Sequence, residues 1–161
     1  MASISTMSQE DWIRYKARLK QQLNNIQIPL DANTGMIKSI LSSIDKSYTN
    51  MRLEFSELEG HREKTESIIR EWEREKAVGK NEIDRKRNAT VAIQNYPGAN
   101  GQVINLYEFH RQIVERHLFL KGTLDALIGK QNRLITFNGM LKLEQGTSPY
   151  SGEGSTKIWE D

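Results

Sequence analysis

The fold is decided by residues 36–76, MIKSILSSIDKSYTNMRLEFSELEGHREKTESIIREWEREK. Twelve positions in this stretch step alternately by four and three residues, and nine of the twelve are apolar. The twelve are Ile37, Leu41, Ile44, Tyr48, Met51, Phe55, Leu58, Arg62, Thr65, Ile69, Trp72 and Lys76. A repeat that averages 3.5 residues keeps its stripe facing one neighbour and favours coiled-coil packing. The sequence therefore predicts a long amphipathic helix that needs a partner.

A second long helix is predicted from about residue 105 to residue 141. Its main apolar seam consists of Leu106, Phe109, Ile113, Leu120, Leu124, Leu127, Leu134 and Leu141. A second stripe, formed by Tyr107, Val114, Leu118, Ile128 and Ile135, widens the apolar face. Because one helix cannot cover so wide a face, we expect a short N-terminal helix or another subunit on the second side. Leu118, Ile128 and Ile135 are the predicted contacts between subunits of a homo-oligomer.

The remaining segments of the chain are shorter. Ser8 is the predicted N-cap of a helix over residues 9–25, with Trp12, Tyr15 and Leu19 on one face. Residues 26–30 (IQIPL) predict an extended link or a short edge strand, and Thr34 is a candidate cap for the first long helix. Helical character is expected to continue past residue 79 to about residue 91.

Residues 95–102 (NYPGANGQ) concentrate proline, glycine and asparagine, so they predict a chain reversal. The sequence after residue 145 gains glycine and serine and predicts a disordered tail, in which Ile158 and Trp159 form either a short docking motif or part of an untethered terminus. The expected fold is all-α: an elongated antiparallel helical hairpin over residues 34–145, preceded by a short helix and linker (1–33) and followed by the tail (146–161).

Composition excludes several classes of function. Cysteine is absent, so disulfides, thiolate metal sites and a thiol nucleophile are excluded. His110 and His117 are seven residues apart, about two helical turns, which is too far for both to bind one metal ion. No catalytic or phosphate-binding motif occurs. We therefore expect a non-enzymatic, soluble, cytoplasmic protein without metal, cofactor or membrane contact.

A basic cluster, defined as Lys80, Arg85, Lys86 and Arg87, lies ahead of the predicted reversal and is followed by Tyr96. Cations can neutralise phosphates and an aromatic ring can stack on an unpaired base, so this combination suits sequence-independent binding of a single strand. Four cations near a helix end also fit simple stabilisation of the helix dipole. Because the 23 Lys and Arg are nearly balanced by 21 Asp and Glu, any attraction to nucleic acid must come from such local clustering.

The layout resembles the UvsY-type recombination mediators of tailed phages. The resemblance covers about residues 45–144 and rests on residues 48–59 (YTNMRLEFSELE), the Lys/Arg-rich end, the Tyr-Pro-Gly turn and residues 122–127 (GTLDAL) in the last helix. It implies ring oligomers that bind single-stranded DNA and help to load a RecA-like recombinase onto strands coated by a single-strand-binding protein, in the host cytoplasm if the protein is viral. It also implies that Arg85, Lys86 and Arg87 contact the DNA.

Two functions of different classes follow. The first is a recombination-mediator-like accessory protein that binds single-stranded DNA. The second is a structural or assembly protein, for example a phage particle component or adaptor, which acts by helix packing alone. The small net charge of +2 and the wide apolar face of the last helix favour the second, whereas the basic cluster beside Tyr96 favours the first.

Overall fold

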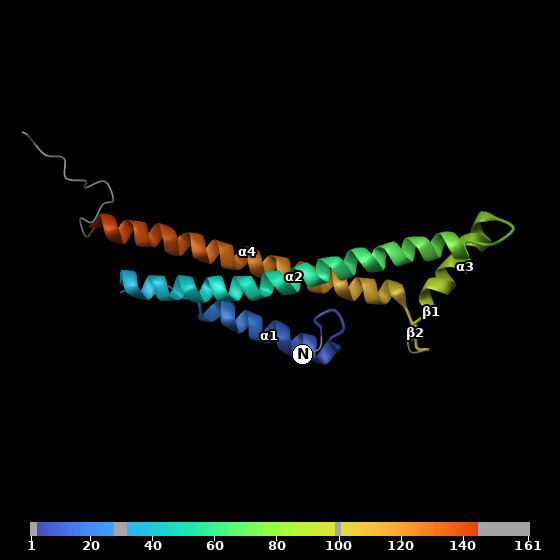
Figure 1. Ribbon diagram of the computed structural model, residues 1–161, viewed down its shortest axis with the longest axis horizontal. Coiled ribbons are helices and arrows are strands. Elements are labelled where there is room, and N and C mark those ends of the chain that lie inside the picture. Colours follow the sequence, from blue (N-terminus) through green and yellow to red (C-terminus); the bar gives the residue numbers. More distant parts are fainter. Residues whose placement is uncertain (1–2, 28–31, 99–100, 145–161) are drawn as a thin grey trace, which may run out of the picture.

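The computed structural model describes residues 3–27, 32–98 and 101–144. The elements, in chain order, are α1 (Gln9–Asn25), α2 (Thr34–Lys76), α3 (Glu82–Gln94), β1 (Tyr96–Pro97), β2 (Val103–Ile104) and α4 (Leu106–Glu144). Helices α2 and α4 lie side by side in opposite directions and form a long rod, as Figure 1 shows. The predicted all-α, elongated hairpin with a short N-terminal helix is confirmed.

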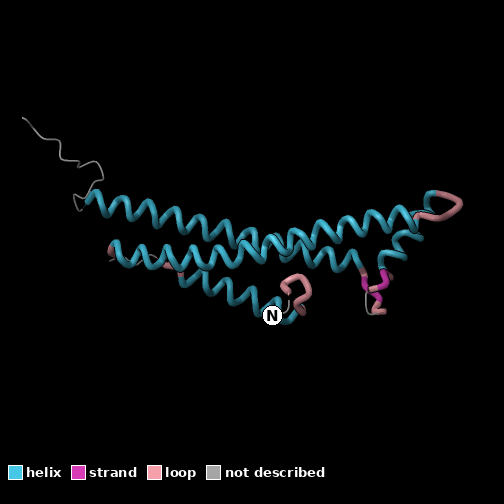
Figure 2. Tube along the Cα trace, in the orientation of Figure 1, coloured by secondary structure: helices cyan, strands magenta, loops and turns pink. Residues whose placement is uncertain are grey.

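The two small strands pair with each other at one end of the rod. Tyr96 pairs with Ile104 and Pro97 with Val103 in an antiparallel ribbon, which leads the chain from α3 into α4 (Figure 2). The last three residues of the predicted link or edge strand (28–30) and the whole predicted tail (146–161) lie outside the described residues. Within the described ranges, no helix combines the length and apolar character needed to cross a bilayer.

The apolar stripes predicted from the sequence form the seam between α2 and α4. From α2, Ile37, Ile44 and Leu58 are completely buried. From α4, Ile113 and Leu120 are buried to the same degree. These residues belong to one continuous apolar cluster, so the hairpin is held together by the 3.5-residue repeat that both helices carry.

Helix α1 packs against the side of α4 that carries Glu115 and Phe119, next to the main seam. Trp12 is fully buried, and its ring meets that of Phe119 edge-on with the centroids 5.4 Å apart. The Tyr15 hydroxyl donates a hydrogen bond to the Glu54 carboxylate on α2. Lys16 forms an ion pair with Glu115 on α4 at 3.3 Å. The predicted wide face of α4 is therefore shielded in part by the chain itself.

A buried arginine fastens the N-terminal segment to α4. Arg116 is only 2% exposed, and one of its nitrogens, Nη1, donates to the carbonyl oxygens of Ile4 and Ser5 at 2.7 and 3.0 Å. The other, Nη2, donates to the carbonyl oxygen of Met7 at 2.8 Å, and the guanidinium lies over the Trp12 ring. Burial lowers the pKa of Arg116, but an arginine stays charged at neutral pH. Carbonyl dipoles and an aromatic face therefore carry most of the stabilisation of this cation.

We call the end of the rod that carries α3 and the β ribbon the tip. A polar layer interrupts the seam towards this end. The His117 ring stacks on Phe55 at 4.3 Å, and its Nε2 lies 4.0 Å from a carboxylate oxygen of Glu59. In the described part of the chain, the buried Nε2 of His117 and Nε of Arg62 have no hydrogen-bond partner. A separate apolar cluster, formed by Ile69, Ile93 and Leu106 with partly buried neighbours, lies beyond this layer. The rod therefore has a large stem core and a small tip core.

The predicted helical character up to about residue 91 is present in α3, but a break separates α3 from α2 that was not predicted. The chain leaves the helix after Lys76, and α3 starts anew with the Asn81 side chain accepting from the Asp84 amide at 2.8 Å. At the other end of α2, Asn33 rather than Thr34 is the N-cap, because its side chain accepts from the Met36 amide at 2.9 Å. Helix α3 folds back along α2 and buries Ala89 and Ile93.

The buried arginine yields a prediction about stability. A lysine at position 116 has one compact ammonium that cannot reach three carbonyl groups, so Arg116→Lys should lower the free energy of unfolding by about 1.5–3 kcal/mol. Urea unfolding measures this change, and hydrogen exchange should show faster exchange of the amides of residues 3–7. The matched control is Arg111→Lys, because Arg111 pairs with Glu108 on an exposed surface. Equal effects of the two variants would contradict the role assigned to Arg116.

The polar layer yields a prediction about pH. Burial, together with the charges of Arg62 and Lys121, lowers the pKa of His117, while Glu59 opposes the shift. The folded state then binds fewer protons than the unfolded chain, so the free energy of unfolding should fall as the pH drops below about 6.5. We expect His117→Gln to remove part of the difference in urea midpoint between about pH 7.5 and about pH 5. His61→Gln removes a half-exposed imidazole and is the control; an unchanged pH dependence in His117→Gln would refute the assignment.

Candidate nucleic-acid interface

The basic cluster lies at the tip of the rod, on the loop of residues 77–81 and on α3. Two hydrogen bonds and one close approach at a glycine hold this loop against the helix. Arg85 donates from Nε to the Gly79 carbonyl at 3.2 Å, and Asn88 donates from Nδ2 to the Val78 carbonyl at 2.6 Å. A Cβ atom at Gly79 would lie 2.7 Å from the Cβ of Asp84, so the close approach requires glycine. The loop thereby holds Lys80 in a defined position beside α3.

An open groove of about 650 Å³ runs along this part of α3. It is lined by Gly79, Lys80, Asp84, Arg87, Asn88, Val91, Ala92 and Asn95. We call this surface the tip groove. Asn95 donates from Nδ2 to the Val91 carbonyl at 2.8 Å, so the amides of both Asn88 and Asn95 are engaged with the backbone.

The four residues of the basic cluster have different environments. Lys86 pairs with Glu82 at 2.6 Å on a fully exposed surface, and Arg85 donates to the loop. Over the ranges that the structure describes, neither Lys80 nor Arg87 has an acidic partner or a side-chain hydrogen bond. These two are also the members of the cluster that line the tip groove. Lys80 and Arg87 thus have no partner among the described residues, whereas Arg85 and Lys86 already bind a carbonyl group and a carboxylate.

Tyr96 was predicted to stack on a base, but the structure gives it a different environment. Its ring meets Trp72 of α2 edge-on, with the centroids 5.2 Å apart, and it packs against the tip core. It is not among the residues that line the tip groove. The aromatic pair holds the β ribbon against the end of α2, so Tyr96 is a structural residue in this conformation.

One acid shares the groove with the two cations. Asp84 is half-buried, and its backbone amide is bound by the helix cap Asn81. A carboxylate at the third position of α3 is favoured by the helix dipole, but it also weakens the positive potential at this end of the groove. The sequence showed this acid between the cations without revealing that it lies in the same groove as Lys80 and Arg87.

The predicted contacts between subunits lie on the outer side of α4. Leu118, Ile128 and Ile135 are 60%, 38% and 54% exposed, so neither α1 nor α2 covers them within this chain. Two glycines, Gly122 and Gly129, lie between or beside them, and a Cβ atom at either position would meet nothing within 4 Å. Packing within the single chain therefore gives no reason for glycine at these two positions.

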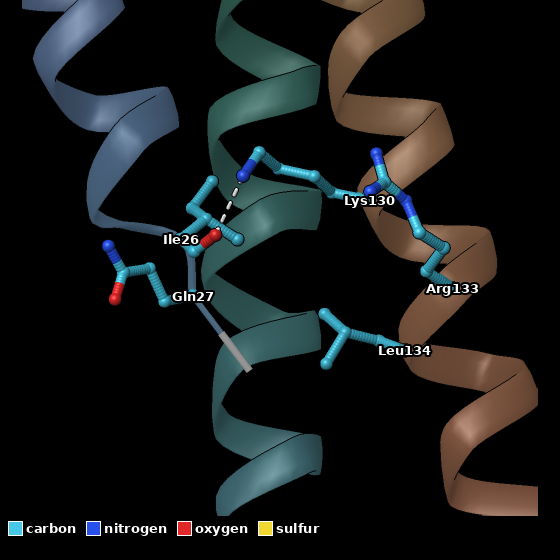
Figure 3. A pocket seen from close by; sticks show the side chains of 5 residues that line it. All are labelled: Ile26, Gln27, Lys130, Arg133 and Leu134. Carbon is cyan, nitrogen blue, oxygen red and sulfur yellow. Dashed lines mark hydrogen bonds between the residues drawn. The ribbon is translucent and has the colours of Figure 1, made fainter. Parts of the chain in front are cut away.

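Another cavity lies where α1 ends, far from the tip. Figure 3 shows Ile26, Gln27, Lys130, Arg133 and Leu134 around it. Lys130 donates from Nζ to the Ile26 carbonyl at 2.7 Å, and Arg133 donates to the Gly129 carbonyl at 3.2 Å. Both cations are held by hydrogen bonds to carbonyl groups, unlike Lys80 and Arg87 of the tip groove. Residues 3–27, 32–98 and 101–144 hold no group of side chains suited to bind a metal ion.

Comparisons with protein-family models, with curated proteins and with solved structures found no match.

Proposed function

We propose that this protein is a non-enzymatic accessory factor that binds single-stranded DNA through the tip groove. The observation that carries the proposal is the pair Lys80 and Arg87, two cations that share one open groove and have no acidic partner among the described residues. A phosphate backbone supplies the missing counter-charge. With the resemblance to UvsY-type mediators, this supports a role in helping a RecA-like recombinase to load onto strands held by a single-strand-binding protein.

Two cations on one chain give weak binding, and self-association would overcome this weakness. Several grooves that contact one strand raise the effective concentration of each for the next phosphate. The exposed Leu118, Ile128 and Ile135 on α4 support such an assembly. Helical glycine costs about 1 kcal/mol relative to alanine, so Gly122 and Gly129 also fit a surface that another helix approaches closely.

The same face of α4 supports a second candidate function, an assembly or adaptor protein that acts by helix packing only. The two candidates differ in the tip groove. A packing protein needs the α4 face and makes no use of Lys80 and Arg87, whereas a strand-binding protein needs both surfaces.

The variant Lys80→Ala/Arg87→Ala tests strand binding. We expect it to weaken binding of a fluorescent poly-dT oligonucleotide and to flatten the slope of log K against log salt by about 1.4 per subunit, because each lost phosphate contact contributes about 0.7. Fluorescence anisotropy at several salt concentrations measures both quantities. The matched control is Lys38→Ala/Lys46→Ala, which removes two exposed cations from the first part of α2.

Asp84→Asn should act in the opposite direction and strengthen binding, because it removes the one acid from the groove. If the wild-type protein does not bind at low salt, or if both double variants weaken binding equally, the proposal fails. If the oligonucleotide bound only to the exposed face of α4, all three variants would keep the wild-type affinity.

Self-association is tested separately on α4. A glutamate in place of Leu118 or Ile135 would place a charge in an apolar contact between subunits, so we expect either variant to lower the particle mass in sedimentation velocity. Leu53→Glu introduces the same charge at an exposed leucine of α2 and should leave the mass unchanged. A wild-type particle with the mass of one chain would reject self-association through this face.

A further inference from the structure

Large aliphatic side chains are exposed at the tip, beside the unpaired cations. Ile83 is 79% exposed, more than any other large hydrophobic residue that the structure describes, and Val91 is 50% exposed. Both are on α3, whose other apolar residues Ala89 and Ile93 are buried. Helix packing within the chain does not explain why large aliphatic side chains are exposed on this highly charged segment.

One of these aliphatic residues lines the tip groove with the cations, and the other lies one turn before it. Ile83, Arg87 and Val91 are spaced by four residues each, so they follow one another along α3. Lys80 on the preceding loop, Arg87 and Val91 line the tip groove together with the acid Asp84, whereas Ile83 does not line it. The surface formed by Lys80, Ile83, Arg87 and Val91 therefore combines two cations with two exposed aliphatic side chains. We call this surface the mixed face.

We propose that the mixed face binds unpaired nucleotides, with Ile83 and Val91 against the faces of the bases and Lys80 and Arg87 at the phosphates. The proposal rests on the function proposed above and adds the base-contacting residues and the preference for single strands. A strand carries both phosphates and bases, and this face offers cations for the phosphates and aliphatic side chains for the bases. The face of a base is accessible when the base is unpaired and is covered by its neighbours in a duplex.

The same geometry explains how a strand could be held without an aromatic platform. Tyr96 packs against Trp72 and does not line the groove. The side-chain amides of Asn88 and Asn95 donate to backbone carbonyls, which limits their capacity to read base edges. Contacts to base faces and phosphates alone carry little sequence information, so we expect similar affinity for strands of different sequence.

The test is the double variant Ile83→Ala/Val91→Ala, since alanine preserves the helix. Base stacking on a side chain contributes about 1–3 kcal/mol where the side chain is aromatic, so loss of the two aliphatic residues should lower the affinity for a poly-dT oligonucleotide about tenfold. The slope of log K against log salt should stay at the wild-type value, because the phosphate contacts remain. The affinity for a duplex of the same length should not change. Leu53→Ala, at an exposed leucine of α2, is the matched control.

Photo-crosslinking with oligonucleotides that carry a diazirine, whose carbene inserts into the C–H and N–H bonds of any nearby side chain, gives an independent readout. We expect crosslinks within residues 80–91 and none at Tyr96. Three outcomes would overturn the inference and leave strand binding intact. They are wild-type affinity in the double variant, an equal loss of affinity for the single strand and the duplex, and crosslinks centred on Tyr96. If the wild-type protein fails to bind the oligonucleotide, the proposed function fails as well. Binding to phosphatidylglycerol vesicles in place of the oligonucleotide would assign the mixed face to a lipid surface and overturn the inference.

Discussion

Burial of the apolar seam between α2 and α4 determines the shape of the molecule, because neither helix can shield its stripe from water alone. Once the buried stripe of α2 (Ile37, Ile44 and Leu58) packs into one cluster with that of α4 (Ile113 and Leu120), the two helices must run side by side over most of their length. The result is a rod rather than a sphere. A rod of two helices leaves much surface exposed, which is why α1 adds Trp12 and Tyr15 to the core and why the outer side of α4 still presents aliphatic residues.

The seam also explains where polar groups are tolerated. Arg116 is buried but has three carbonyl partners, so its charge is compensated and it connects the N-terminal segment to α4. His117, which stacks on Phe55 of the stem core, and Arg62 each have a buried nitrogen without a hydrogen-bond partner among the described residues. Because a buried polar atom without a partner costs free energy, this layer is a weak point of the rod. The tip therefore depends on its own small core of Ile69, Ile93 and Leu106 for its order.

The sequence predicts the features that follow from local periodicity. The 3.5-residue repeat identified both long helices, and Ser8 identified the start of α1. It does not predict the break at residues 77–81, because that segment contains a single glycine and the break is fixed by distant contacts. Asn88 binds the Val78 carbonyl ten residues away, and Ile93 gains burial only if α3 folds back. Arg116 was missed for the same reason, since its carbonyl partners lie more than 100 residues earlier in the chain.

The sequence groups the candidate residues, but the structure shows which of their side chains already have partners. Four cations and a tyrosine close in sequence indicated the tip, yet the structure pairs Lys86 with Glu82, ties Arg85 to the loop and packs Tyr96 on Trp72. Charge and residue type do not show which side chains are already engaged, because that depends on where α3 turns. The turn leaves Lys80 and Arg87 without partners among the described residues and brings Val91 into the same groove.

The two proposed surfaces lie on different parts of the rod, and this separation bears on how they could work together. The tip groove is at the loop and α3, whereas the predicted subunit contacts are on α4, which runs from the tip towards the other end of the rod (Figure 1). Self-association through α4 would therefore leave each tip groove open. Subunits that pack with their rods parallel would place all tips at one end, where a single strand could pass from groove to groove. A weak site on each chain then becomes sufficient, because the strand is held by several subunits at once.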